Sequence, residues 1–369
     1  MQATFEIILI ACLVATSAAI PGCFLILRRM AMMSDAISHS VLLGIVVMFF
    51  AVKNLHSPLL IIAAAITGLI TVSLTEALIA SKQMKKDAAI GLIFPLFFAV
   101  AIILISQFAG NIHLDQDAVI LGEIAFAPFN RFQLGHLDLG PIGLWVMGGI
   151  TIINSLFVYL FFKELKISTF DSHLAKCLGF TPTLIHYGLM SCVSITCVGA
   201  FDIVGTILIV ALIITPPATA YLITSKLSHM IILSIIIGCA SAILGTFLAI
   251  LIDGSISGAI CSVSGLLFTL AFLFSPEHGI VQKFYNQKKQ KVQFSAILLT
   301  IQFLNHQSES RNPYEYSFLN LIEHMQWSEA FAHKVISHAM AKNYIQFERP
   351  YYKLTTYGIE VAKNAMSSS

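Results

Sequence analysis

The sequence predicts an all-α polytopic membrane protein of about eight to nine transmembrane helices, followed by a small winged helix-turn-helix-like domain. Of its 369 residues, 57% are hydrophobic and 11% are charged, whereas a soluble domain carries about 25% charged residues. The mean hydropathy of +0.85 also requires a largely apolar surface. The seven cysteines lie mostly in apolar runs and form no CxxC pair, so we expect no disulfide framework.

Nine apolar runs approach the roughly 20 residues that cross a bilayer. They are 5–27, 36–52, 58–80, 88–107, 141–162, 183–198, 203–223, 230–252 and 257–274. The first run lacks the basic start of a cleaved signal peptide, so we expect it to be a retained helix. The sixth and seventh runs are separated by only four residues. The apolar stretch 118–128 is too short to span and suggests a half-helix that enters the membrane.

The basic residues predict the orientation of these spans. With the N-terminus outside, the external loops hold Lys53 and Arg131, and the cytoplasmic loops hold nine Lys and Arg residues. These nine are Arg28, Arg29, Lys82, Lys85, Lys86, Lys163, Lys166, Lys176 and Lys226. Loops rich in Lys and Arg stay in the cytoplasm. Because the number of spans is odd, the C-terminus is then on the side opposite the N-terminus, in the cytoplasm.

The chain changes character after residue 286. We expect a membrane domain at 1–286, a basic linker at 287–291 and a cytoplasmic winged-helix-like domain at 292–369. The expected elements of this last domain are helices at 293–305, 314–325, 329–343 and 354–365, with a strand pair at 347–352. Its charge is nearly balanced, which disfavours nucleic-acid binding because phosphate contacts dominate such binding.

Asp35 and His39 are four residues apart, so they share one face of a helix. A carboxylate with an imidazole suits Mn²⁺, Fe²⁺ or Zn²⁺. Two ligands make half a site, which a second copy related by a two-fold axis would complete, with Ser34 and Ser38 orienting the ligands. In the alternative interpretation, Ser34 caps the helix, Asp35 faces the positive end of its dipole and His39 bonds a neighbouring helix.

A second acidic cluster is expected on the external side, where it would attract or pass on a cation. It consists of His113, Asp115, Asp117 and Glu123. A solvated acidic loop is the alternative interpretation and needs no ligand.

A third stretch predicts a short amphipathic cytoplasmic helix that ends at Gly179. Its residues of interest are Asp171, Ser172, His173, Leu174, Ala175 and Gly179. This helix is either a docking knob for a soluble partner or an ordinary surface helix. The sequence contains no GxxxxGK[S/T] motif, so ATP hydrolysis would have to occur on another polypeptide and we do not expect this chain to be an enzyme.

Five stretches, in the same order along the chain, resemble the bacterial ABC-3 family of metal-ion permeases. The most specific is Arg28-Arg-Met-Ala-Met-Met-Ser-Asp-Ala-Ile-Ser-His39, preceded by 22–27. The others are 87–94, 121–123, 168–175 and 211–220. The resemblance covers roughly residues 5–280. Ser34 stands where the family usually has Gly before the Asp, a departure that bears on entry into the helix.

This resemblance implies a permease of an ATP-binding-cassette importer in the bacterial inner membrane, with Mn²⁺, Zn²⁺ or Fe²⁺ as cargo and no permanently bound cofactor. It further implies a homo- or heterodimeric permease, two cytoplasmic ATPase subunits and an extracytoplasmic metal-binding protein. Asp35 and His39 match the D-A-x-S-H motif, which is expected to contact the metal. The helix from Asp171 to Gly179 matches the region that docks on the ATPase.

Two other functions stay open from the sequence. An importer of a larger metal chelate would need a wide pore and not the Asp35–His39 pair. A membrane-tethered, metal-responsive regulator would act through the C-terminal domain, because residues 352–362 resemble the wing and last helix of winged-helix regulators, including metal-dependent repressors. For that domain we favour a protein contact or a regulatory role over DNA binding.

Overall fold

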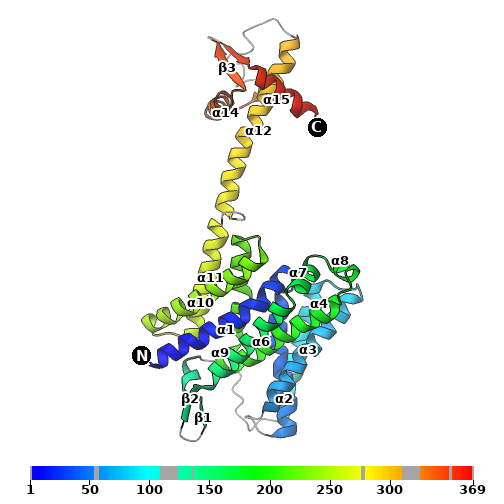
Figure 1. The fold of residues 1–369 in the computed structure, drawn as a ribbon, viewed down its shortest axis with the longest axis vertical. Coiled ribbons are helices and arrows are strands. Elements are labelled where there is room, and N and C mark those ends of the chain that lie inside the picture. Colours follow the sequence, from blue (N-terminus) through cyan, green and yellow to red (C-terminus); the bar gives the residue numbers. More distant parts are fainter. Residues whose placement is uncertain are drawn as a thin grey trace. The chain divides into compact units, whose positions relative to one another are not determined.

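The computed structural model describes residues 2–53, 58–108, 124–134, 137–275, 279–309, 325–348 and 351–367. The chain divides into two compact units, Met1–Gly279 and Ile280–Ser369, and each is described by itself (Figure 1). The predicted boundary at residue 286 therefore falls seven residues after the division that the structure shows.

Unit 1 is a helical bundle, as predicted. Eight of its helices are long and apolar enough to cross a membrane. They are α1 Gln2–Leu27, α2 Met32–Val52, α3 Pro58–Ala80, α4 Lys86–Phe108, α6 Ile142–Leu160, α9 Pro182–Ile223, α10 Leu227–Ile252 and α11 Ile256–Phe274.

Five shorter elements lie at the ends of the bundle. The 3₁₀ helix η1 (Ile124–Phe129) precedes an antiparallel hairpin of β1 (Arg131–Leu134) and β2 (Leu137–Pro141). Two short helices, α7 (Phe162–Phe170) and α8 (Ser172–Cys177), follow α6. The half-helix expected at 118–128 is described only from residue 124 onward, where the chain forms η1.

The sixth and seventh predicted spans lie in one assigned helix, α9, which is interrupted at Gly205 (φ 76°, ψ 170°). A straight helix of its 42 residues would be about 63 Å long, twice the thickness of a bilayer core. Its start instead lies beside its end, because Ile185 packs in one cluster with Leu227, four residues beyond Ile223. The chain therefore reverses at Gly205, and α9 consists of two helical segments that run in opposite directions.

Hydrogen bonds show the direction of the second half of α9. The carbonyl of Val204 accepts from Ser257 at the start of α11, and the carbonyl of Leu222 accepts from Ser275 just beyond its end. This half is therefore parallel to α11. In the first half, Ile203 lies against Gly143 at the start of α6 and Gly188 lies against Phe157 near its end, so this half is antiparallel to α6.

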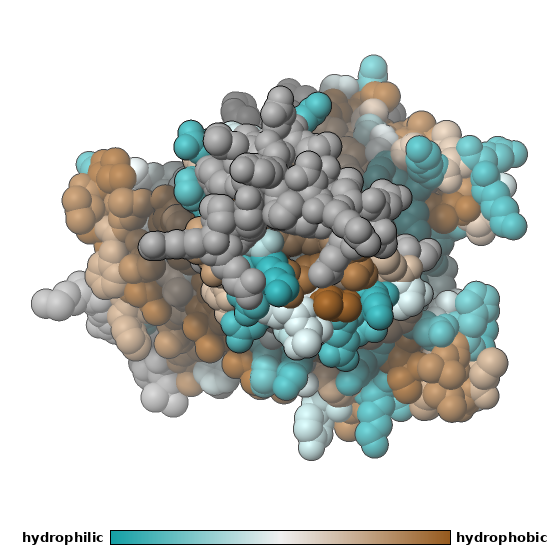
Figure 2. All heavy atoms as spheres, turned by 90° about the horizontal axis from the view of Figure 1, so that it is seen from above, coloured by the Kyte–Doolittle hydropathy of each residue, from teal (hydrophilic) through white to brown (hydrophobic). Residues whose placement is uncertain are grey.

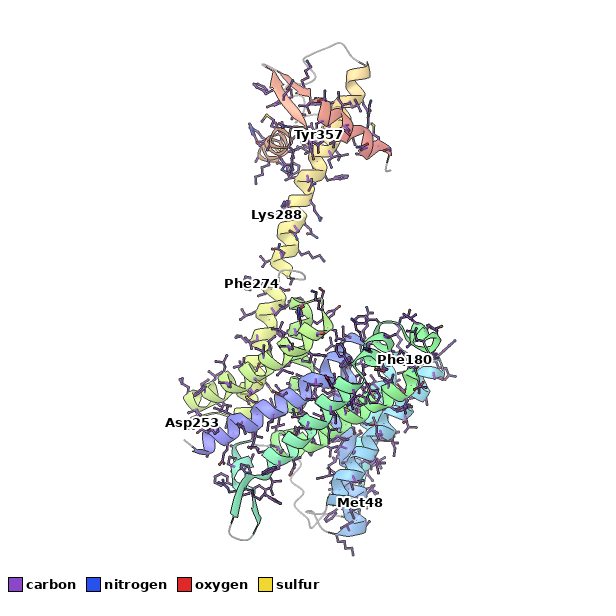
Figure 3. All side chains as sticks on the ribbon, viewed as in Figure 1. Met48, Phe180, Asp253, Phe274, Lys288 and Tyr357 are labelled. Carbon is purple, nitrogen blue, oxygen red and sulfur yellow. The ribbon has the colours of Figure 1, made fainter. Side chains whose placement is uncertain are left out.

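The basic residues separate between the two ends of the bundle. The nine Lys and Arg residues assigned above to one side all lie at the end that carries α7 and α8, either in these two helices or at the turns beside them. Lys53 ends α2 at the opposite end, and there Arg131 of β1 donates to Glu6 of α1 over 3.2 Å. In Figure 3, Phe180 marks the α8 end and Met48 the other end of α2.

Small residues and hydroxyl groups hold the helices together. The α-carbon of Gly22 approaches the carbonyl of Ile213 so closely that a Cβ there would clash with it. Gly44 has the same relation to the backbone of Ala63 on α3. Lipid offers no hydrophobic drive for helix association, so close packing of this kind carries the contact.

Figure 2 shows hydrophobic residues along much of the visible sides of the molecule.

Unit 2 contains α12 (Ile280–Glu309), α14 (Glu329–Ala341), the antiparallel strands β3 (Ile345–Glu348) and β4 (Tyr351–Leu354), and α15 (Thr356–Ser367). Three of the predicted helices and the strand pair are confirmed, while the helix expected at 314–325 lies almost wholly outside the described residues. The predicted linker at 287–291 is wrong as a separate segment, because these residues continue α12. Lys and Gln are good helix formers, which explains the continuation.

A small core holds unit 2 together. Leu299 and Phe303 of α12 pack in one buried cluster with Val335 and Ile336 of α14 and with Ile345 of β3. The order of helix, helix, hairpin and helix agrees with the elements predicted there. The identification of this unit as a winged helix stays a prediction.

Replacing Gly205 by Ala should destabilise unit 1. The combination of φ 76° and ψ 170° belongs to a region that is essentially restricted to Gly, and such strain costs about 1–3 kcal/mol. We expect a lower thermal unfolding midpoint for the detergent-purified protein. Gly265→Ala on α11 is the control, since a Cβ there would meet no neighbour. Equal midpoints for both variants would contradict the reversal at Gly205.

Candidate functional site

The turn between α1 and α2 sets the start of the candidate site. Arg29 adopts the left-handed conformation (φ 55°), and the amides of Arg29 and Met30 donate to the carbonyls of Ile26 and Leu25. These two bonds are the Schellman pattern that ends a helix. Helix α2 begins at once at Met32, so Asp35 lies in its first turn.

The structure brings Asp35 and His39 together, as their spacing predicted. His39 Nε2 lies 3.4 Å from Asp35 Oδ1, and the side chains are 30% and 40% exposed, respectively. Phe94 and Phe98 of α4 hold the imidazole: each ring centroid is 5.8 Å from that of His39, one stacked and one edge-on. Helix α2 therefore supplies both polar atoms of the candidate pair, and two phenylalanine rings of α4 pack against the imidazole.

The spacing of these two atoms suits a shared metal ion. Zinc ligands of this kind bind at about 2.0–2.2 Å, so two of them are about 3.4 Å apart at a tetrahedral angle. The observed distance of 3.4 Å therefore needs little adjustment. The part of the chain that the structure describes contains no cluster of three or more His, Cys, Asp or Glu side chains with metal-site geometry. Further ligands would have to come from elsewhere.

Ser34 and Ser38 do not act as the sequence suggested. Both are buried, and their hydroxyls donate to the carbonyls of Ala31 and Ser34 within the α2 region. A hydroxyl has a single proton to donate, so neither can also donate to Asp35. The alternative of Ser34 as the N-cap is wrong too, because Ala31 occupies that position and α2 begins at Met32.

The predicted external cluster of His113, Asp115, Asp117 and Glu123 lies outside the described residues. Its role stays a prediction.

Helix α8 has the limits that the sequence predicted. Asp171 is its N-cap, and Oδ1 accepts from the amides of His173 and Leu174, each over 2.9 Å. Gly179 (φ 84°) follows its C-terminus, where the amides of Gly179 and Phe180 close a second Schellman pattern on the carbonyls of Lys176 and Ala175. Both ends of this short helix are therefore capped by the sequence itself.

The exposed surface of α8 and of the residues directly beside it is unusually apolar. Ala175 is fully buried, whereas Phe170, Leu174 and Leu178 are 65%, 49% and 55% exposed. A hollow adjoins this face and is lined by Lys176, Phe180, Thr181, Pro182, Thr183, Leu184 and Tyr187. An exposed apolar face beside a hollow is typical of a protein interaction site.

One polar cluster was missed by the sequence analysis. The guanidinium of Arg28 bonds Ser168 and Thr169 of α7 and His186 of α9, and His186 also contacts Glu76 of α3. Burial lowers the pKa of Arg28, and the charge of Glu76 opposes this shift. The sequence analysis used Arg28 only as one of the basic loop residues that predict orientation. Glu76, an ionisable residue in an apolar span, was the available signal.

Comparison with known proteins gives the family. Residues 1–275 match the ABC 3 transport family. The chain is 44% identical over 366 residues to the zinc transport system membrane protein TroD of Treponema pallidum, covering 99% of this chain and 100% of that protein. It is 44% identical over 271 residues to the manganese transport system membrane protein MntD of Bacillus subtilis, covering 73% of this chain and 92% of that protein.

A solved structure agrees with these sequence matches. PsaBC from Streptococcus pneumoniae in complex with Fab matches with a TM-score of 0.62 and 31% identity, covering 77% of this chain and 94% of the matched chain. The chain therefore belongs to the ABC 3 transport family, and the resemblance noted from its motifs is confirmed. The match to TroD extends through unit 2, whereas the family match ends before it.

Removing the cap of α8 should loosen this helix. Asp171→Ala deletes the oxygen that accepts from two amides, and losing an N-cap costs about 1 kcal/mol. We expect amide hydrogen exchange in residues 172–178 to be about fivefold faster by mass spectrometry. Asp171→Asn keeps an acceptor and is the control. The same exchange rate in all three proteins would show that the cap does not hold α8.

Proposed function

We propose that this chain is the membrane-spanning permease subunit of an ATP-binding-cassette importer that moves Mn²⁺, Zn²⁺ or Fe²⁺ into the cytoplasm. The observation that carries the proposal is the pair of Asp35 Oδ1 and His39 Nε2, 3.4 Å apart on α2. Relatives at 44% identity are named for zinc and manganese transport, which supports the cargo class. A carboxylate with an imidazole suits all three metals.

The proposed setting is the bacterial inner membrane, with the N-terminus outside and the C-terminus in the cytoplasm. The concentration of Lys and Arg at the α8 end supports this orientation, since such loops stay cytoplasmic. The cluster of His113, Asp115, Asp117 and Glu123 would then be on the external side, where we assign it to ion entry.

The proposed partners follow from what this chain lacks and exposes. Without a P-loop in its sequence, it would depend on a cytoplasmic ATPase dimer, with hydrolysis on those subunits and no enzyme activity of its own. Exposed Leu174 and Leu178 of α8 would dock there. An extracytoplasmic binding protein would deliver the ion, and a second permease subunit, identical or paralogous, would complete the pathway.

In the proposed mechanism, Asp35 and His39 of each permease subunit hold the ion between them. The ion is cargo, so the site must bind it weakly enough for release. ATP-driven closure of the cytoplasmic subunits moves α8 and with it the bundle, which turns the site from the outside to the inside. No permanently bound cofactor takes part.

For unit 2 we propose a regulatory, winged-helix-like domain that contacts protein. Its buried cluster of α12, α14 and the hairpin supports an independently packed unit. The nearly balanced charge of residues 292–369 disfavours nucleic acid as a partner.

Metal uptake should depend on the Asp35–His39 pair. The double variant Asp35→Asn with His39→Ala, expressed with the ATPase and binding protein, should lose about tenfold or more of the uptake of one metal, because both ligand atoms are weakened or removed. Elemental analysis of cellular Mn, Zn and Fe measures this loss. Asp253→Asn with His229→Ala is the matched control, since both residues are exposed.

Two outcomes would contradict this proposal. Normal uptake by the double variant would exclude the pair as the site. If none of the three metals responds to the assembled wild-type transporter, the function itself is wrong, and a larger metal chelate becomes the leading candidate.

Docking of an ATPase on α8 should protect Cys177. This thiol is exposed at the end of α8, whereas the other six cysteines are buried or half-buried. We expect a membrane-impermeant thiol reagent to label Cys177 of the permease alone and to label it several-fold more slowly in the ATPase complex, as read by intact-protein mass spectrometry. Cys177→Ser identifies the labelled site. Equal labelling in both states would place the ATPase elsewhere.

A further inference from the structure

Five polar side chains form one network at the α8 end of the bundle, here called the Arg28 network. It consists of Arg28, Glu76, Ser168, Thr169 and His186. Arg28 Nε donates to Thr169 Oγ1 over 3.0 Å, and Nη2 donates to Ser168 Oγ over 2.9 Å. Its Nη1 lies 2.9 Å from His186 Nδ1. A single guanidinium thus joins the end of α1 to α7 and α9.

The chemistry of these groups determines which atoms donate and which accept hydrogen bonds in the network. Arginine has donors and no acceptor, so Nδ1 of His186 accepts and its ring proton is on Nε2. That nitrogen faces Oε1 of Glu76 on α3. The cation of Arg28 is therefore linked through a neutral imidazole to the anion of Glu76. The side chains of His186 and Glu76 are only 14% and 28% exposed, so solvent screens this link weakly.

The network adds a polar attachment of α7 to an apolar one. Leu165 is the one residue of α7 that is buried, and it packs with Ile185 and Leu189 of α9. That contact is apolar and has no directional requirement. The fork of Arg28 holds Ser168 and Thr169 at fixed angles. These two residues come just before Asp171, the cap of α8, so the position of α8 follows that of Arg28.

The Arg28 end of the network lies close in sequence to the proposed metal ligands, Asp35 and His39. Arg28 is the last residue before the Schellman turn at Arg29 and Met30, and α2 starts two residues after that turn. Asp35 is in the first turn of α2. A displacement of α8 that moves Arg28 therefore also moves the start of the helix that carries Asp35 and His39.

We propose that the Arg28 network couples movement of α8 to α1, α2, α3 and α9, with Arg28 as its positioning residue. Arg28 is not assigned to metal binding, because its charge would repel a cation. This inference rests on the function proposed above and assigns a role to residues outside the proposed ligand pair and outside the docking face of α8.

The test measures metal ions imported per ATP hydrolysed in proteoliposomes that contain the permease, its ATPase and the binding protein. Arg28→Gln should lower this ratio about tenfold, the change expected from loss of one charge-assisted hydrogen bond, while the complex still assembles and hydrolyses ATP. Arg29→Gln is the matched control, because Arg29 is the exposed neighbour, and its ratio should equal that of the wild type.

A second variant covers the case in which Arg28→Gln fails to assemble. Ser168→Ala with Thr169→Val removes the bonds to α7 and leaves Arg28, His186 and Glu76 paired, so folding should survive and the ratio should still fall several-fold. Ser262→Ala with Thr269→Val removes two exposed hydroxyls of α11 that donate only to carbonyls of the same helix, and this matched pair should change nothing. An unchanged ratio in the double variant overturns the proposal, as does a parallel fall of uptake and hydrolysis, which indicates a merely structural role.

The proposed function and the coupling role fail in different ways. A wild-type complex that hydrolyses ATP and imports none of the three metals contradicts the function alone. Stimulation of ATP hydrolysis by added binding protein then reports coupling without any cargo. If both network variants keep the full wild-type stimulation, the coupling role is wrong as well.

Discussion

A backbone surrounded by lipid must satisfy its own hydrogen bonds, and this constraint governs unit 1. It forces long helices, and it permits a break only where protein covers the chain. Gly205 is such a place: the chain reverses there between α1, α6 and α11, and Ser257 donates to the carbonyl of the preceding Val204. At the α8 end, the Schellman turns at Arg29 and Gly179 satisfy the last carbonyls of α1 and α8. The polar side chains of the candidate sites lie next to such helix ends.

Between the helix ends, polar groups are used for packing. Thr67, Thr71 and Thr75 of α3 each donate to the carbonyl four residues earlier, which leaves them without a hydroxyl proton for a ligand. Asn154 of α6 bonds other helices instead of its own. Its amide donates to Ser17 O of α1 and to Thr196 of α9, and so ties three helices together. Asp35 and His39 differ from all of these in pairing with one another while remaining partly exposed, which is what ligands for a passing ion require.

Hydropathy and spacing were enough to predict the helices, the shared face of Asp35 and His39 and the capped helix α8, because each depends on neighbours in sequence. They misplaced the start of α2 by four residues, since Ser34 and Asp35 interrupt the apolar run. They also placed the break of α9 at 199–202, because a positive φ at Gly205 leaves no trace in hydropathy. The Arg28 network could not be predicted: Glu76 and His186 are 110 residues apart and meet only after α3 packs on α9.

Charge explains why the proposed ligand pair would need a second permease subunit. One carboxylate with one imidazole nitrogen supplies a single negative charge to a bound metal, so a divalent ion held by one copy would keep one uncompensated positive charge. Two copies supply two carboxylates, which neutralise the ion, and two imidazoles, which complete four ligands. Each subunit alone would then hold the ion poorly, and the strength of binding would depend on how closely the two α2 helices approach. A movement that separates them would release the ion without any change in protonation, and the Arg28 network lies at the end of α2 where such a movement would begin.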